Sequence, residues 1–238
     1  MDSTFVVGID VGGQTSKLGV VDARGAVLAQ TVIRTDTYSE VEPYIAELAE
    51  AVKKIIRESG TEGKVRGIGV GAPNGNYYTG TIENAPNLLW GRQRVEFAKL
   101  LSEAMDGLPV ALTNDANAAA VGEMTYGAAR GMKNFIMITL GTGVGSGIVI
   151  NGEVVYGHDG FAGELGHVAA VRNNGRTCGC GKTGCLETYA SATGVARTAR
   201  EWLELSDEPS VLRSLDTIAS KDVYEAAKEG DRVALKIF

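Results

Sequence analysis

Residues 5–22, FVVGIDVGGQTSKLGVVD, decide the fold of this chain. The run Phe5–Asp10 is typical of a buried strand, and Lys17–Asp22 is typical of a second strand. Between them, Val11–Ser16 contains two adjacent glycines, which lack a Cβ atom and therefore allow a sharp turn. The stretch predicts a hairpin with a glycine corner at one end.

The rest of the first half extends this hairpin into a sheet with helices. Ala23–Ala26 turns the chain into a third predicted strand, Val27–Ile33. Ser39 followed by Glu42 is a capping-box pattern, and the apolar residues after it recur at helical spacing until Gly60. The next elements are predicted as strand, loop, helix and strand over 65–70, 71–90, 95–105 and 109–113. The order βββαβαβ predicts a mixed α/β sheet.

The opening plan of strand, glycine turn and strand occurs a second time. Phe135–Leu140 and Ser146–Ile150 are the predicted strands, and Gly141–Gly145 is the turn between them. Asn151-Gly152 is a favoured two-residue hairpin turn, which leads into a third strand. We interpret this repetition as an internal duplication, and we predict two related lobes, 1–112 and 113–238.

Composition and charge exclude several classes of protein. The chain has 238 residues, of which 44% are hydrophobic, and its formal net charge is −6. A protein that binds nucleic acid needs a basic face, so no nucleic-acid partner is expected. No stretch reaches the roughly 20 apolar residues of a membrane span, and no basic leader is present at the start. We therefore predict a cytoplasmic protein with no membrane contact.

The two glycine corners are candidates for binding phosphate. Glycine permits backbone N–H groups to approach a phosphate closely, so two corners that face each other would form a nucleotide cleft. Asp10 precedes the first corner and could hold a phosphate-bound metal ion, although an Asx-type turn cap is an equally good interpretation. The candidate nucleotide-binding residues are Asp10, Gly12, Gly13, Gln14, Thr15, Gly141, Thr142 and Gly143.

A polar segment follows the strand predicted at 109–113. Asn114, Asp115 and Asn117 lie between that strand and an alanine-rich helix. Ligand clefts form where strands end and helices begin, and a carboxylate there could accept a hydroxyl proton during phosphoryl transfer. The alternative is that Asn114 or Asp115 caps the helix.

All three cysteines lie close together in the second half. Cys178, Cys180 and Cys185 follow the segment Gly163–His167, so three thiols and one imidazole are available near one another. A Cys3His set is a closed tetrahedral zinc site, and the intervening glycines allow the short loops to wrap around the ion. We predict a structural Zn²⁺ bound by His167, Cys178, Cys180 and Cys185; the alternative is that the cysteines are small buried side chains.

The same residues carry a family resemblance. The sequence Gly-Glu-x-Gly-His at Gly163–His167, followed by Cys-x-Cys-Gly-x-x-Gly-Cys-x-Glu at Cys178–Glu187, resembles the ROK proteins, which include repressors and sugar kinases of the actin-like ATPase superfamily. The resemblance runs from Phe5 to Ser191. It implies an α/β fold of two actin-like, ribonuclease H-like lobes with mixed sheets.

The resemblance also implies an activity and a site. It implies phosphorylation of a hexose, most often glucose, by ATP with Mg²⁺ in a homodimeric enzyme, with Asp115 as the catalytic base. In family members the zinc-binding histidine also contacts the sugar. The implied sugar-binding residues are Asn87, Asn114, Glu164, His167 and Glu187.

Two departures from the family pattern affect these expectations. Gln14 stands where family kinases usually have Thr, which puts one phosphate contact in doubt and admits polyphosphate as the donor. Family kinases also continue beyond the helical-looking segment Asp222–Phe238, so the second lobe is expected to be incomplete.

Other functions remain open. The chain could be a sugar-binding regulator of the ROK type or a catalytically incomplete sugar-binding fragment. Mannose, fructose and N-acetylmannosamine are alternative substrates.

Overall fold

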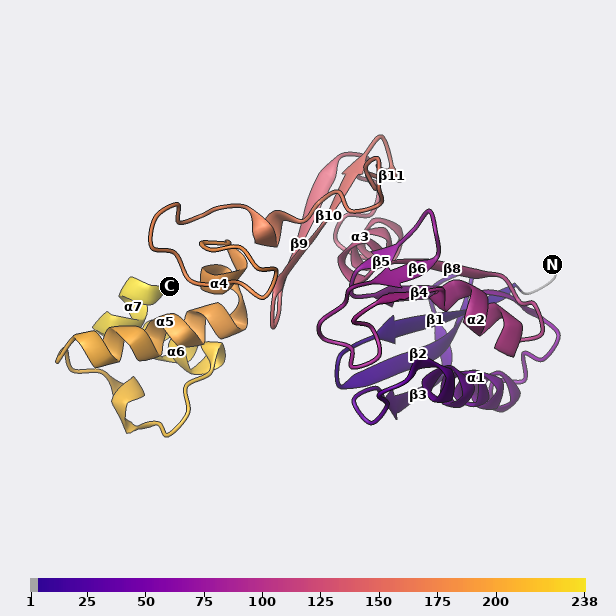
Figure 1. Cartoon of the computed structure of the whole chain (residues 1–238), viewed down its shortest axis with the longest axis horizontal. Coiled ribbons are helices and arrows are strands. Elements are labelled where there is room, and N and C mark those ends of the chain that lie inside the picture. Colours follow the sequence, from indigo (N-terminus) through magenta and orange to yellow (C-terminus); the bar gives the residue numbers. More distant parts are fainter. Residues whose placement is uncertain (1–3) are drawn as a thin grey trace. The chain divides into compact units, whose positions relative to one another are not determined.

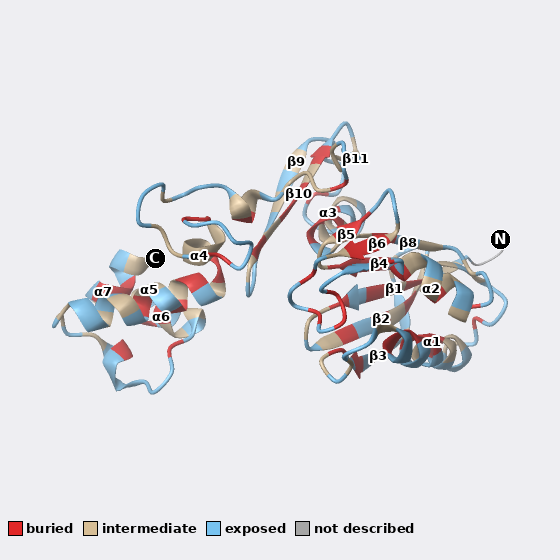
Figure 2. Ribbon diagram, in the orientation of Figure 1, coloured by how far each residue is buried: buried red, intermediate tan, exposed pale blue. Residues whose placement is uncertain are grey.

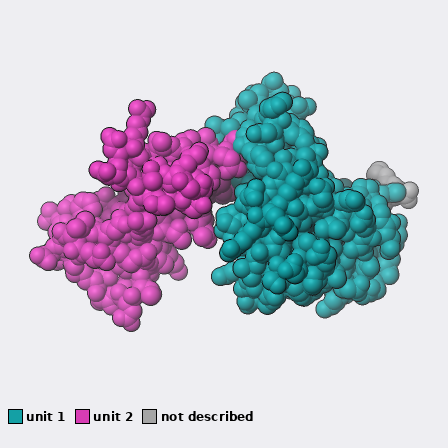
Figure 3. All heavy atoms as spheres, viewed as in Figure 1, with its two compact units in different colours: residues 1–137, 147–162 teal, residues 138–146, 163–238 magenta. Residues whose placement is uncertain are grey.

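The computed structural model describes residues 4–238 and contains two compact units (Figure 3). The first unit comprises the chain up to Met137 together with Gly147–Ala162, and the second comprises Ile138–Ser146 and Gly163–Phe238. The lobe division at 112/113 remains a prediction. Within the described residues, no helix combines the length and the apolar character that crossing a membrane requires.

A five-stranded mixed sheet forms the centre of the first unit (Figure 1). The hairpin predicted from the glycine corner is present, with Asp10 opposite Lys17. Strand β4 pairs with β1 in parallel, and β8 pairs with β4 in parallel, so the carboxyl ends of these three strands share one edge. The sheet order is β3-β2-β1-β4-β8, with β1 (Phe5–Val11), β2 (Thr15–Asp22), β3 (Val27–Arg34), β4 (Val65–Ala72) and β8 (Val110–Asn114).

Two helices cover this sheet and bury its core. Helix α1 (Val41–Glu58) contributes apolar residues at helical spacing, and α2 (Phe97–Ala104) adds a second apolar face. Figure 2 shows the buried residues concentrated where the strands and these helices meet. The capping box predicted at Ser39 is wrong: the N-cap is Glu40, so Ser39 lies one residue outside the helix, and no side chain caps it.

The segment predicted as a loop over 71–90 contains short strands. β5 (Gly75–Asn76) and β6 (Thr81–Glu83) form a small sheet with β7 (Arg94–Val95). The buried Asn76 organises the segment: its Oδ1 accepts the Tyr78 N–H at 3.0 Å, and its Nδ2 donates to the Asp159 carbonyl at 2.9 Å. Polar side-chain hydrogen bonds hold this segment, and its sequence shows no alternation of apolar and polar residues. The strands were therefore not predicted.

The second strand–turn–strand pattern also folds as expected. Strands β9 (Phe135–Leu140), β10 (Val144–Ile150) and β11 (Glu153–Val154) form a sheet in the order β11-β10-β9, the counterpart of β3-β2-β1. Asn151 and Gly152 have φ values of 55° and 83°, as the predicted hairpin turn requires.

The second unit ends in short helices with a small core of their own. Its helices are α4 (Glu187–Ala190), α5 (Ala192–Leu205), α6 (Ser220–Lys228) and α7 (Arg232–Ile237), with 3₁₀ turns at Leu165–His167 and Val211–Ser214. The helical segment predicted over 222–238 is broken into two helices at Gly230, whose φ of 88° no helix can accommodate.

Candidate functional site

The carboxyl edge of the first sheet gathers several predicted site residues. The strand register places Asp10 opposite Gly71 and Gly71 opposite Thr113, so these residues form a row across β1, β4 and β8. Asn114 ends β8, and Asp115 is the first residue of helix α3 (Asp115–Tyr126). Parallel pairing therefore brings Asp10 and Asp115, more than 100 residues apart in the sequence, to the same edge.

The geometry of α3 answers which residue caps this helix. Asn114 is the N-cap, and its Oδ1 accepts the Ala116 N–H at 2.9 Å. Asp115 Oδ1 also accepts this N–H, at 2.8 Å. Asp115 retains exposed surface, but protein atoms crowd its carboxyl and displace water, which raises the pKa of this carboxyl. The negative charge of Asp10 raises this pKa further, against the lowering effect of the Ala116 N–H.

The first glycine corner is closed by a hydrogen bond from the Gly12 N–H to the Thr15 carbonyl at 3.1 Å. A Cβ atom at position 13 would lie 2.8 Å from the Asn87 carbonyl oxygen, so only glycine permits the loop that carries Asn87 to pack here. The Gln14 carbonyl accepts the Thr35 N–H at 2.9 Å. The structure thus brings Asn87 beside the corner that contains Gly12, Gly13, Gln14 and Thr15.

A buried hydroxyl cluster lies behind this corner. Ser16 Oγ is 2.8 Å from Thr35 Oγ1 and 2.7 Å from the Tyr44 hydroxyl, and all three residues are buried. Burial raises the pKa of Tyr44 to about 12, so its hydroxyl keeps its proton and its hydrogen bond. Tyr44 also stacks on Trp90 with ring centroids 5.0 Å apart, and the buried Trp90 packs against the core. Ser16 lies in β2, Thr35 just after β3 and Tyr44 in α1, so sequence periodicity could not show that they meet.

The predicted zinc ligands lie together in the second unit. The ligand atoms of His167, Cys178, Cys180 and Cys185 are all within 4.8 Å of one another. His167 Nδ1 is 3.6 Å from Cys178 Sγ, and the sulfurs of Cys180 and Cys185 are 3.7 Å apart. Sulfurs bound tetrahedrally at about 2.3 Å from one zinc ion lie roughly 3.8 Å apart, so the donor set fits zinc in chemistry and spacing.

The histidine uses its two ring nitrogens in different directions. Nδ1 faces the thiols, whereas Nε2 is 3.9 Å from the carboxylate of Glu164. Glu164 is the N-cap of the 3₁₀ turn Leu165–His167, and the Ser146 hydroxyl donates to the Gly163 carbonyl just before it. Glu164 and His167 therefore lie at the two ends of one short turn that is anchored to β10.

The second glycine corner is fixed by the segment that follows the cysteines. The Glu187 carboxylate accepts the Val144 N–H at 2.9 Å through Oε2, and its Oε1 lies 3.8 Å from Cys178 Sγ. A Cβ atom at position 143 would overlap Oε2, so a side chain there would push the Glu187 carboxylate aside. Glu187 thus contacts both the corner formed by Gly141, Thr142 and Gly143 and the thiol cluster.

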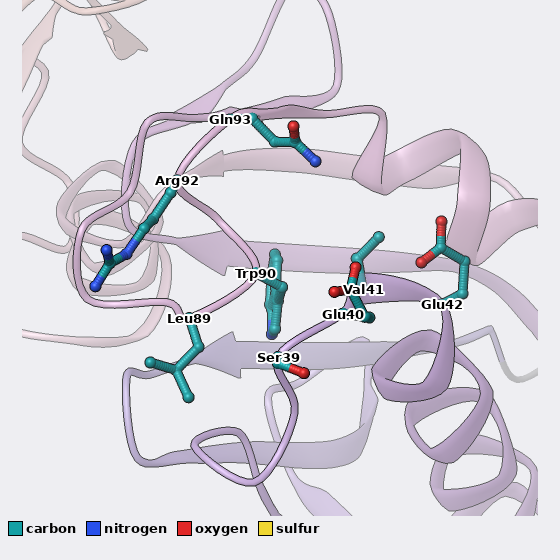
Figure 4. Close-up of a pocket in the computed structure, with 8 residues that line it drawn as sticks. All are labelled: Ser39, Glu40, Val41, Glu42, Leu89, Trp90, Arg92 and Gln93. Carbon is teal, nitrogen blue, oxygen red and sulfur yellow. The ribbon is translucent and has the colours of Figure 1, made fainter.

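One hollow of about 330 Å³ lies outside these groups, beside the start of α1 (Figure 4). Its lining contains none of the predicted site residues and consists of Ser39, Glu40, Val41, Glu42, Leu89, Trp90, Arg92 and Gln93.

The family profile that matches this chain, over residues 6–238, is that of the ROK family. The chain belongs to the ROK family. A glucokinase of Halalkalibacterium halodurans is 40% identical, and the alignment covers the whole of this chain and 72% of that protein. A xylose repressor of Caldicellulosiruptor bescii is 30% identical, and the alignment covers 98% of this chain and 58% of that protein.

A solved structure supports the same assignment. The ROK family glucokinase of Streptomyces griseus, in complex with glucose and AMPPNP, superimposes with a TM-score of 0.75 at 35% identity. The match covers 98% of this chain and 74% of that structure. The predicted ROK fold of the α/β class, with mixed sheets, is thereby confirmed.

Proposed function

We propose that this ROK protein transfers the γ-phosphoryl group of ATP to a hexose, with glucose as the first candidate. The observation that carries the proposal is the position of Asp115 at the start of α3, on the same sheet edge as Asp10, with a raised pKa. A carboxylate whose pKa is raised holds a transferred proton better, which suits a general base. The glucokinase relatives support glucose as the substrate.

In the proposed reaction, Asp115 accepts the proton of the attacking sugar hydroxyl. The hydroxyl oxygen forms a bond to the γ-phosphorus, the bond to the bridging oxygen breaks, and ADP leaves. Most of the rate enhancement in such reactions comes from positioning and charge neutralisation. Asp10 offers a carboxylate that would hold Mg²⁺ directly or through water, and the ion would supply positive charge beside the phosphates.

The remaining site residues receive roles by family resemblance. Asn87, Asn114, Glu164, His167 and Glu187 would bind sugar hydroxyls, and their amide, carboxylate and imidazole groups are suited to that task. The two glycine corners would bind the nucleotide phosphates through backbone N–H groups. The three cysteines and His167 would hold a structural zinc ion, because four protein ligands leave no open position for catalysis.

The test is ADP release with Mg-ATP across a panel of hexoses, with polyphosphate as an alternative donor. We expect turnover with glucose in the wild-type chain and a loss of at least about 100-fold in kcat for Asp115→Asn, from removal of the general base. The matched control is Asp106→Asn, since Asp106 is an exposed aspartate in a turn with positive φ, where asparagine is well tolerated. Equal turnover in both variants would contradict the proposed mechanism.

A sugar-responsive regulator is the second candidate, because the xylose repressor aligns with almost the whole chain. The two functions differ in their ligands: a kinase binds both sugar and nucleotide, whereas a regulator needs sugar alone. A ligand that binds the folded state raises the melting temperature by mass action. Protection by glucose but not by Mg-AMPPNP would favour the regulator.

Cytoplasmic location and homodimer formation remain predictions. The cysteine cluster requires reduced thiols to bind a metal, which agrees with a reducing compartment. Analytical ultracentrifugation would test the dimer.

A further inference from the structure

Helix α5 begins beside the second glycine corner and holds it through two consecutive carbonyl groups. The Ala192 N–H donates to the Gly141 carbonyl at 2.8 Å, and the Thr193 hydroxyl donates to the Thr142 carbonyl at 2.8 Å. Thr193 is 51 positions away from Thr142 in the sequence, so the contact is a tertiary tether rather than a local turn. None of the sequence patterns assigned a role to Thr193.

The direction of the Thr193 hydroxyl is set by a buried neighbour. Ser191 is 1% exposed, and its Oγ accepts the Gly194 N–H at 3.0 Å as the N-cap of α5. Ser191 Oγ also lies 3.0 Å from Thr193 Oγ1. Because the Thr193 hydrogen is used on the Thr142 carbonyl, the Ser191 hydroxyl donates to Thr193. The chain of hydroxyls therefore runs from Ser191 through Thr193 to the corner.

The two tethers determine where the corner presents its N–H groups. In a trans peptide unit, the C=O and the following N–H point in opposite directions. Holding the Gly141 and Thr142 carbonyls against α5 therefore turns the N–H groups of Thr142 and Gly143 away from α5. Successive backbone N–H groups that point the same way in a turn can form an anion-binding concavity.

We propose that Thr193 is a positioning residue for nucleotide binding: its hydroxyl fixes the Thr142 peptide so that the second glycine corner presents its N–H groups to a phosphate. The inference rests on the proposed kinase function, because the phosphate is that of the nucleotide. Glu187 holds the other side of the corner through the Val144 N–H, so the loss of Thr193 would loosen one end of a segment fixed at both ends. Thr193 contacts no reacting atom in this role.

Substitution of Thr193 by valine tests the tether, because valine has the same shape without the hydroxyl. A neutral hydrogen bond contributes enough for a two- to tenfold change, roughly, in an equilibrium constant. We expect Thr193→Val to raise the Kd for Mg-AMPPNP and the KM for ATP by about this factor, with a smaller change in the KM for glucose. Thr193→Ser keeps the hydroxyl and should restore wild-type affinity.

Thr198→Val is the matched control on the same helix. The Thr198 hydroxyl also donates to a backbone carbonyl, that of Gly194 at 2.9 Å, but this carbonyl belongs to α5 itself. We expect no change in nucleotide affinity for this variant. Equal effects of the two valine substitutions, or equal losses of glucose and nucleotide affinity in Thr193→Val, would overturn the proposal.

Hydrogen exchange provides a second readout that needs no ligand. We expect faster exchange over 138–146 in Thr193→Val than in Thr198→Val, because the corner loses a tether. Unchanged exchange would overturn the inference, as would faster exchange with unchanged nucleotide affinity. A wild-type chain that binds no nucleotide would overturn the proposed function itself, and the exchange data would still show whether Thr193 orders the corner.

Discussion

Replacement of Gly143 by alanine should displace the Glu187 carboxylate and weaken sugar binding. A Cβ atom at this position would overlap Oε2 of Glu187 and lie 3.1 Å from its Cδ, whereas φ at Gly143 is not positive and adds no strain. The carboxylate is the end of a side chain and can move, but moving it breaks its 2.9 Å hydrogen bond with the Val144 N–H. The substitution therefore removes one charge-assisted hydrogen bond, the one between the Val144 N–H and Oε2 of Glu187.

The magnitude follows from the hydrogen bond that the displaced carboxylate would no longer make to a sugar hydroxyl. A hydrogen bond to a charged group contributes about 1.5–3 kcal/mol, and each 1.4 kcal/mol is a factor of about ten in an equilibrium constant. If Glu187 binds the sugar as proposed, we expect the Kd for glucose to rise by at least about tenfold in Gly143→Ala. The measurement is calorimetric titration with glucose.

Gly141→Ala is the matched control, because a Cβ atom there meets nothing within 4 Å in the same corner. A second control is the double variant with Glu187→Gln, in which Gly143→Ala should add less than its full effect, since the two changes act on one carboxylate. The reasoning is refuted if Gly143→Ala and Gly141→Ala bind glucose equally well. It is also refuted if the effects of Gly143→Ala and Glu187→Gln are fully additive.

Three further predictions concern stability and metal content. Crowding raises the pKa of the Asp115 carboxyl, so the folded state binds this proton more tightly than the unfolded state does. The free energy of unfolding therefore falls as pH rises above the ordinary pKa of aspartate. Asp115→Asn should melt at a higher temperature than the wild type at pH 7, and the difference should shrink at pH 4. Tyr44→Phe removes a buried hydroxyl that is hydrogen-bonded to Ser16, so denaturant titration should show a loss of about 1 kcal/mol in the free energy of unfolding. In the same variant, the absorbance titration of tyrosine should lose a group that ionises only near pH 12. Cys178→Ala removes one of four ligands, so elemental analysis should find about one zinc per wild-type chain and a small fraction of that in the variant; equal zinc contents would contradict the metal site.

Local sequence signals predicted the elements that depend on neighbouring residues alone. The glycine corner between β1 and β2 and the Asn151-Gly152 turn were predicted because the allowed φ values of glycine and asparagine determine such turns. The start of α1 was mispredicted because the residues of a capping-box pattern can occur one position away from the true N-cap of the helix.

Long-range contacts carry the part of the candidate site that the sequence could not show. The spacing of Cys178, Cys180 and Cys185 indicated their convergence, since short loops with glycine can bring thiols together. In contrast, the bond between Glu187 and the Val144 N–H spans 43 positions, and it depends on the tertiary position of α4. Periodicity describes a residue's own element and is silent about such partners.

The surroundings of Asp115 in the first unit bear on its proposed catalytic role. Asn114 already accepts the Ala116 N–H and caps α3, so a second acceptor at Asp115 adds little to the helix. The carboxylate is instead crowded and lies within the field of Asp10, and both effects disfavour its charged form. Because Asn114 already caps the helix and the surroundings disfavour the charged carboxylate, the Asp115 side chain contributes little to stability. Its position at the shared end of three parallel strands is the one that a proton acceptor for a bound hydroxyl would need, which supports catalysis over capping.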